Sequence, residues 1–93
     1  MKGLKEKDKE IIINYSKKYN VKEVYLFGSA VYGSEPDDID LGVSGLAPEK
    51  FFSFFVDISE KISRKLDLFY MDAKDAKRFA ELIKKEGVLL YGE

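Results

Sequence analysis

The segment DIDLGVSG at positions 38–45 most constrains the fold, because its residues alternate strictly between two kinds. Ile39, Leu41 and Val43 are apolar, and acids or glycine stand between them. Successive side chains of a β-strand point to opposite faces, so this period of two predicts a strand over 38–45. One face of that strand belongs in a core, and the other carries acids.

Three helices and three more strands are predicted from the remaining periodicity. Apolar residues recur at helical spacing in three segments, while the segment EVYLFG is apolar on both faces, as in a strand covered on two sides. Pro48 suits a first helical turn, Asp72 suits a helix cap, and Asn20 and Gly87 suit helix ends. The predicted helices cover Leu4–Tyr19, Pro48–Ser63 and Ala73–Glu86, and the strands cover Glu23–Gly28, Leu66–Met71 and residues 88–91.

This order of elements predicts an α/β (α+β) fold, with a mixed sheet of about four strands packed against helices. The length of 93 residues leaves room for one domain, so we assign residues 1–93 to it. The predicted inward stripes of the last two helices are Phe51, Phe55, Ile58 and Ile62, then Ala76, Phe79, Ala80 and Ile83. Phe52 and Phe54 flank the first stripe and suggest an interface, with a second copy of the chain or with a partner protein.

Composition excludes several classes of site and partner. The 16 basic and 17 acidic residues nearly cancel, so the chain lacks the basic excess of a dedicated nucleic-acid binder. There is no cysteine and no histidine, which excludes disulfides and the common zinc sites and leaves oxygen ligands for any metal. The charged N-terminus does not resemble a signal peptide, and no apolar run is long enough to span a bilayer. We therefore expect a cytoplasmic protein with no membrane partner.

Three aspartates are candidate metal ligands. Asp38 and Asp40 lie two residues apart on one strand face, with Cα atoms about 7 Å apart. Gly42 follows on that face, and we expect it to leave the neighbouring space empty. Asp67 lies in the middle of a later strand, where apolar neighbours should not tolerate an isolated charge. A divalent cation shared by the three carboxylates would satisfy it, and such a set can hold two Mg²⁺ ions about 3.5 to 4 Å apart. A solvated acidic strand edge is the alternative.

The turn between the first two strands has the residues of an anion site. Gly28 permits close approach of a ligand, Ser29 offers a hydroxyl, and residues 29–33 can form a short helix with free N–H groups. A triphosphate is the expected ligand. Gly28 and Gly33 have P-loop spacing, but Ser34 and Glu35 stand where a P-loop needs lysine and then serine or threonine, so we reject that motif.

Together, GSAVYG, DDIDLGV and the later Asp67 resemble the minimal nucleotidyltransferases of the DNA polymerase beta superfamily, MntA-like antitoxins among them. The resemblance covers nearly the whole chain. It implies a nucleotidyltransferase fold in which Gly28 and Ser29 hold the β and γ phosphates of ATP or another triphosphate, and we assign Gly33 to the same nucleotide-binding set. It also implies that Asp38 and Asp40 bind two Mg²⁺ ions, and that Asp67 contacts a metal or activates the attacking hydroxyl.

The resemblance further implies a partner. A chain of this size has no module for a large acceptor, and minimal members of the family are commonly antitoxins of a HEPN-type RNase, with a tyrosine hydroxyl as acceptor. We therefore expect transfer of AMP to a hydroxyl on a partner protein. Two departures stand out: Tyr32 replaces an arginine usual in the family, and Asp37 replaces a serine. A binding module that acts by contact alone, and an aminoglycoside nucleotidyltransferase, are the alternatives.

Overall fold

The computed structural model describes residues 3–32 and 38–92, and in this part of the chain helices and strands follow in the predicted order. The three α-helices and four strands are α1 (Glu6–Lys18), β1 (Glu23–Phe27), β2 (Asp38–Ser44), α2 (Phe51–Ser59), β3 (Lys65–Tyr70), α3 (Lys77–Glu86) and β4 (Val88–Tyr91). Three short 3₁₀ segments join them: η1 (Gly28–Tyr32), η2 (Pro48–Lys50) and η3 (Lys74–Ala76). None of the helices described is long and apolar enough to cross a bilayer.

The four strands form one mixed sheet in the order β3-β2-β1-β4, which confirms the predicted fold class. β1 pairs antiparallel with both β2 and β4, whereas β2 and β3 are parallel. Parallel neighbours need a crossover connection, and α2 supplies it between β2 and β3. α1 ends before Asn20, whose φ of 57° is left-handed and stops the helix there as predicted.

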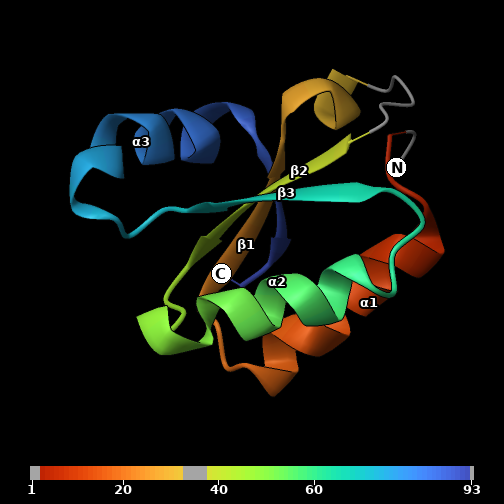
Figure 1. Ribbon diagram of the computed structural model, residues 1–93. Helices are drawn as coiled ribbons and strands as arrows, with labels where there is room; N and C mark the ends of the chain where they lie inside the picture. Colours follow the sequence, from red (N-terminus) through yellow and green to blue (C-terminus); the bar gives the residue numbers. More distant parts are fainter. Residues whose placement is uncertain (1–2, 33–37, 93) are drawn as a thin grey trace.

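The main core lies between the sheet and the pair α1 and α2, which run side by side across one face (Figure 1). The apolar residues Ile39, Leu41 and Val43 of β2 are fully buried there, together with Ile12 of α1 and Ile58 of α2. This is the face that the alternation in β2 predicted to be apolar. The acids of β2 therefore lie on the opposite face of the sheet, the one that α3 approaches (Figure 1).

α2 departs from the prediction in its end and in its buried face. The helix stops at Ser59, and Ser63 beyond it is held by the buried Asp8 of α1, which accepts hydrogen bonds from the Ser63 backbone N–H and hydroxyl. Phe54 is fully buried against Tyr19, since α2 packs on α1 as well as on the sheet, so its apolar face is wider than one sheet requires. Of the two phenylalanines predicted to form an interface, only Phe52 is exposed, at 72%.

α3 packs on the acidic face of the sheet, over a small second core. The buried members of that core are Tyr25, Met71, Ala80 and Ile83. Gly42 makes the packing possible, because a Cβ at this position would lie 2.8 Å from the Met71 sulfur and 3.3 Å from Ile83 Cδ1. The space beside Gly42 is therefore filled by side chains, and our expectation of an empty place next to the acids was wrong.

Asp72 does not cap the last helix. Its carboxylate accepts a hydrogen bond of 2.7 Å from the Gly45 N–H and one of 3.3 Å from the Ser44 hydroxyl. These bonds join the end of β3 to the end of β2, and η3 intervenes before α3 begins at Lys77. The cap prediction failed because the Asp72 carboxylate bonds to Ser44 and Gly45 instead of to the start of the helix.

Candidate functional site

Asp40 lies at the centre of the candidate site because of its place in the sheet register. It pairs with Phe27 of β1 on one side and with Asp67 of β3 on the other. Asp38 precedes it by two residues, so both side chains leave the same face of β2, and both are half-buried. The sheet thus places the three predicted aspartates at the same end of the face that α3 partly covers.

The three carboxylates act on one another electrostatically. Burial of the Asp40 carboxyl raises its pKa above the ordinary value, and the charges of Asp67 and then Asp38 raise it further. A hydrogen bond between Asp40 and Asp67 acts in the same direction. Asp40 therefore sits in a field of negative charge, which a bound cation would relieve.

Asp67 is exposed, contrary to the expectation that its apolar strand neighbours would bury it. It lies in β3, an edge strand of the sheet, whose burial pattern leaves Asp67 exposed and Leu66 buried. The argument that an isolated charge needs a partner applies instead to Asp40, which is half-buried and whose pKa is raised by that burial.

Gly28 brings the turn directly against Asp40. Its φ of 76° is left-handed, and a Cβ added there would collide with an Asp40 carboxylate oxygen. Both observations favour glycine at this position, and the predicted close approach of a ligand stays a prediction. The chain then enters η1, which includes the backbone of Ser29, so the predicted short helix forms next to the carboxylates. The Ser29 side chain and Gly33 lie outside the described residues, and their predicted roles stay predictions.

The donor set has the chemistry of a magnesium site. All three candidate ligands are carboxylates, which suit hard cations, and their mutual repulsion on Asp40 favours a positive ion between them. Within residues 3–32 and 38–92, however, no three acids converge on one point as formed metal ligands do. The three aspartates fit a divalent cation by charge and donor type, and not by a preformed arrangement of ligands.

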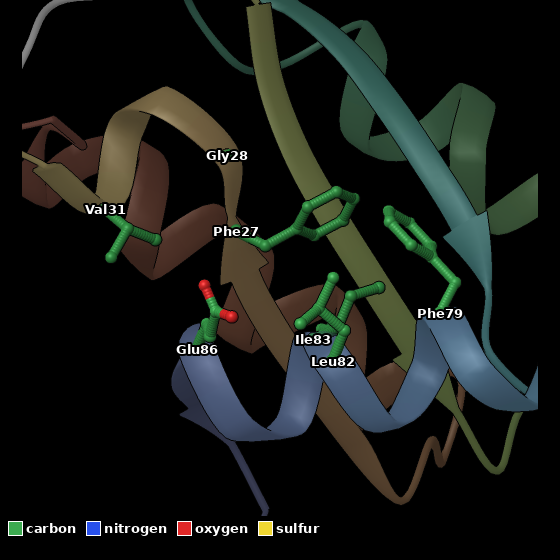
Figure 2. Close-up of a pocket in the computed structure, with 7 residues that line it drawn as sticks. All are labelled: Phe27, Gly28, Val31, Phe79, Leu82, Ile83 and Glu86. Atoms are coloured by element: carbon green, nitrogen blue, oxygen red, sulfur yellow. The ribbon is translucent and has the colours of Figure 1, made fainter.

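Sequence reasoning missed an apolar pocket that adjoins these acids. It lies between the β1–η1 junction and the C-terminal half of α3 (Figure 2). Phe79 of α3, expected in the core, is 43% exposed and contacts the rings of Phe27 and Phe69 edge-to-face. Its helical spacing fitted a core position, so no local signal marked it as part of a surface pocket.

A family model described as "Polymerase beta, Nucleotidyltransferase" matches residues 10–93. The chain belongs to this nucleotidyltransferase family. Its four-stranded mixed sheet and three helices, in the part described, are the nucleotidyltransferase fold that the resemblance implied. No curated protein sequence matches the chain.

Two solved structures share the nucleotidyltransferase fold. One is a toxin–antitoxin with AMP-PNP, with a TM-score of 0.73 and 20% identity over 91% of this chain and 73% of that chain. The other is the toxin–antitoxin MntA-HpeT in a mutant with two aspartates, spaced two positions apart, changed to glutamate. It has a TM-score of 0.73 and 18% identity, with the same coverage of both chains. At this identity the likeness establishes the common fold of the nucleotidyltransferase domain.

Proposed function

We propose that the chain is a magnesium-dependent nucleotidyltransferase that transfers AMP from ATP to a hydroxyl on a partner protein. The observation that carries the proposal is the position of Asp40. It pairs with Asp67 in the sheet register, the charges of Asp67 and Asp38 raise its pKa, and a Cβ at Gly28 would collide with its carboxylate. Membership of the nucleotidyltransferase family supports the reaction class.

In this proposal Asp38, Asp40 and Asp67 hold the magnesium ions, and the backbone of Gly28 and Ser29, with Gly33, holds the phosphates. Bound magnesium supplies positive charge that neutralises the triphosphate and stabilises the leaving pyrophosphate. Tyr32 stands where the family usually has an arginine, so a basic side chain of the partner can supply the missing positive charge. The raised pKa of Asp40 supports this assignment, because repulsion among ligands is relieved when a cation binds.

The reaction follows from these placements. The acceptor oxygen forms a bond to the α-phosphorus, and the bond from that phosphorus to the pyrophosphate oxygen breaks. Asp67 accepts the proton of the attacking hydroxyl, a role that its exposed side chain suits because an acceptor on another protein can reach it. Pyrophosphate departs at the turn formed by Gly28 and Ser29. The chain thus contributes mainly positioning and charge stabilisation.

We further propose that the partner is a HEPN-type toxin and that this chain is its cytoplasmic antitoxin. Two structures with the same fold are toxin–antitoxins, and one of them contains the ATP analogue AMP-PNP. The other has two aspartates altered at the spacing of Asp38 and Asp40. These likenesses support the choice of partner and nucleotide.

Labelled ATP tests the reaction class. The purified chain is incubated with magnesium, an extract of source cells, and ATP labelled at either the α or the γ phosphate. Nucleotidyl transfer places the α label on a protein and leaves it free of the γ label, whereas phosphoryl transfer does the reverse. We expect the α label alone, its loss in Asp40→Asn, and full labelling in Asp75→Asn, an exposed acid of η3. Labelling that survives in Asp40→Asn would contradict the proposal.

A further inference from the structure

The pocket between α3 and the β1–η1 junction has mainly apolar and aromatic walls. The Phe27 and Phe79 rings meet edge-to-face, with centroids 5.6 Å apart at an interplanar angle of 85°, and Ile83 and Leu82 rise from α3 beside them (Figure 2). Val31 of η1 closes the opposite side. Apolar and aromatic walls with few polar groups are typical of small-molecule pockets.

This pocket is continuous with the proposed phosphate and metal site. Gly28 lines it, and Gly28 is also the residue that abuts the Asp40 carboxylate. Phe27, its aromatic wall, is the register partner of Asp40 in the sheet. A triphosphate bound at the Gly28 turn therefore has an apolar cavity beside it, on the side of α3.

Glu86 is the single acidic residue among those described as lining the pocket. Its side chain lies across the pocket from Phe79, with the carboxylate directed towards η1 (Figure 2). An ionised carboxylate can only accept hydrogen bonds. Purine bases present N–H groups on the edge that such an acceptor would meet: guanine has two adjacent donors, whereas adenine has one donor beside a ring-nitrogen acceptor.

We infer that the pocket holds the purine base of the nucleoside triphosphate, with its hydrogen-bonding edge at Glu86. The inference rests on the proposed function and adds the location of the base. It assigns the aromatic and apolar walls to packing against the base, and it makes Glu86 the acceptor for the amino group of adenine. A glutamine at this position would both accept and donate, which matches the adenine edge better than the guanine edge.

Calorimetric titration with magnesium and ATP, GTP or inorganic tripolyphosphate tests the inference, because tripolyphosphate has no base. Wild type should bind both nucleotides more tightly than tripolyphosphate. Glu86→Gln should shift the ratio of GTP to ATP affinity towards ATP by about tenfold, the scale of one hydrogen bond to a charged group. Glu81→Gln, on the same helix but outside the pocket, should leave the ratio unchanged.

A second pair of variants tests the apolar walls without disturbing the core. Leu82, 45% exposed, lines the pocket, and Leu89 of β4, 39% exposed, does not. Leu82→Ala should weaken both nucleotides severalfold and leave tripolyphosphate unaffected, whereas Leu89→Ala should change none of the three.

The outcomes separate this inference from the proposed function. If tripolyphosphate binds as tightly as the nucleotides, or if Glu86→Gln leaves the purine ratio unchanged, the base lies elsewhere and the phosphate site stands. If Leu82→Ala abolishes labelling of the acceptor protein without changing nucleotide affinity, the pocket belongs to the partner and the inference is wrong. Absence of any magnesium-dependent triphosphate binding would contradict both the inference about the base and the proposed function.

Discussion

The contact between Gly28 and Asp40 predicts the cost of a single methyl group. In Gly28→Ala, the new residue must adopt a φ of 76°, which costs an L-residue about 1–2 kcal/mol. Its Cβ also collides with an Asp40 carboxylate oxygen. Moving that carboxylate out of its preferred rotamer adds about 0.5–1.5 kcal/mol. We therefore expect the free energy of unfolding to fall by about 2–3 kcal/mol, most of it from the backbone.

Urea unfolding followed by far-UV circular dichroism measures this free energy, and a double-mutant cycle separates its two parts. In an Asp40→Ala background the collision is gone, so Gly28→Ala should cost only the backbone contribution of about 1–2 kcal/mol. Gly45→Ala is the matched control. Gly45 has the same φ of 76°, but its Cβ would meet Lys22, so its cost should not depend on Asp40.

Equal costs of Gly28→Ala in the two backgrounds would refute the proposed contact. Binding gives a second readout of the same geometry. Gly28→Ala should also weaken magnesium-dependent ATP binding, since it displaces a proposed metal ligand and alters the phosphate turn, whereas Gly45→Ala should not. Unchanged ATP affinity in Gly28→Ala would show that the turn does not form part of the site.

Three further variants test the packing and electrostatics that support the site. Gly42→Ala should lower the free energy of unfolding by about 1–3 kcal/mol in urea titrations, because overpacking forces α3 away from the sheet; an unchanged midpoint would contradict this. Asp8→Ala should lower it by about 2–3 kcal/mol and Ser63→Ala by about 1 kcal/mol, because only the first also leaves the Ser63 backbone N–H unpaired; the reverse order would be inconsistent with the hydrogen bonds. The Tyr19 hydroxyl donates to Asp57, and this hydrogen bond, above all, raises the tyrosine pKa. A raised folded-state pKa contributes stability that is present below the ordinary tyrosine pKa and lost as the pH rises through the folded value, so wild type should lose stability more steeply than Tyr19→Phe in alkaline urea titrations; parallel pH profiles would count against the bond.

The fold could be predicted because its signals are local. Alternation in residues 38–45 fixed both the strand and its buried face, and Asn20 marked a helix end through its own backbone preference. The burial of Phe54 could not be foreseen from α2 alone, because it depends on α1 packing beside it. Asp72 likewise precedes a helix in sequence but bonds to Gly45, which is distant along the chain.

The site was predictable in part for the same reason. Gly28, Asp38 and Asp40 belong to one short segment, so their proximity follows from a turn and a strand. The pairing of Asp40 with Asp67 depends on the register of two strands joined by a helix, which no local pattern sets. Glu86, at the end of an ordinary amphipathic helix, gave no signal, because its place in the pocket comes from how α3 crosses the sheet.

Calorimetric titration of the metal-free protein with ATP, in the presence and absence of magnesium, tests the central claim most directly. Wild type and Asp75→Asn should bind ATP only when magnesium is present, and Asp40→Asn should not bind it. Magnesium-dependent binding that persists in Asp40→Asn, or equal binding with and without magnesium, would contradict the assignment of the three aspartates as the metal site of a nucleotidyltransferase.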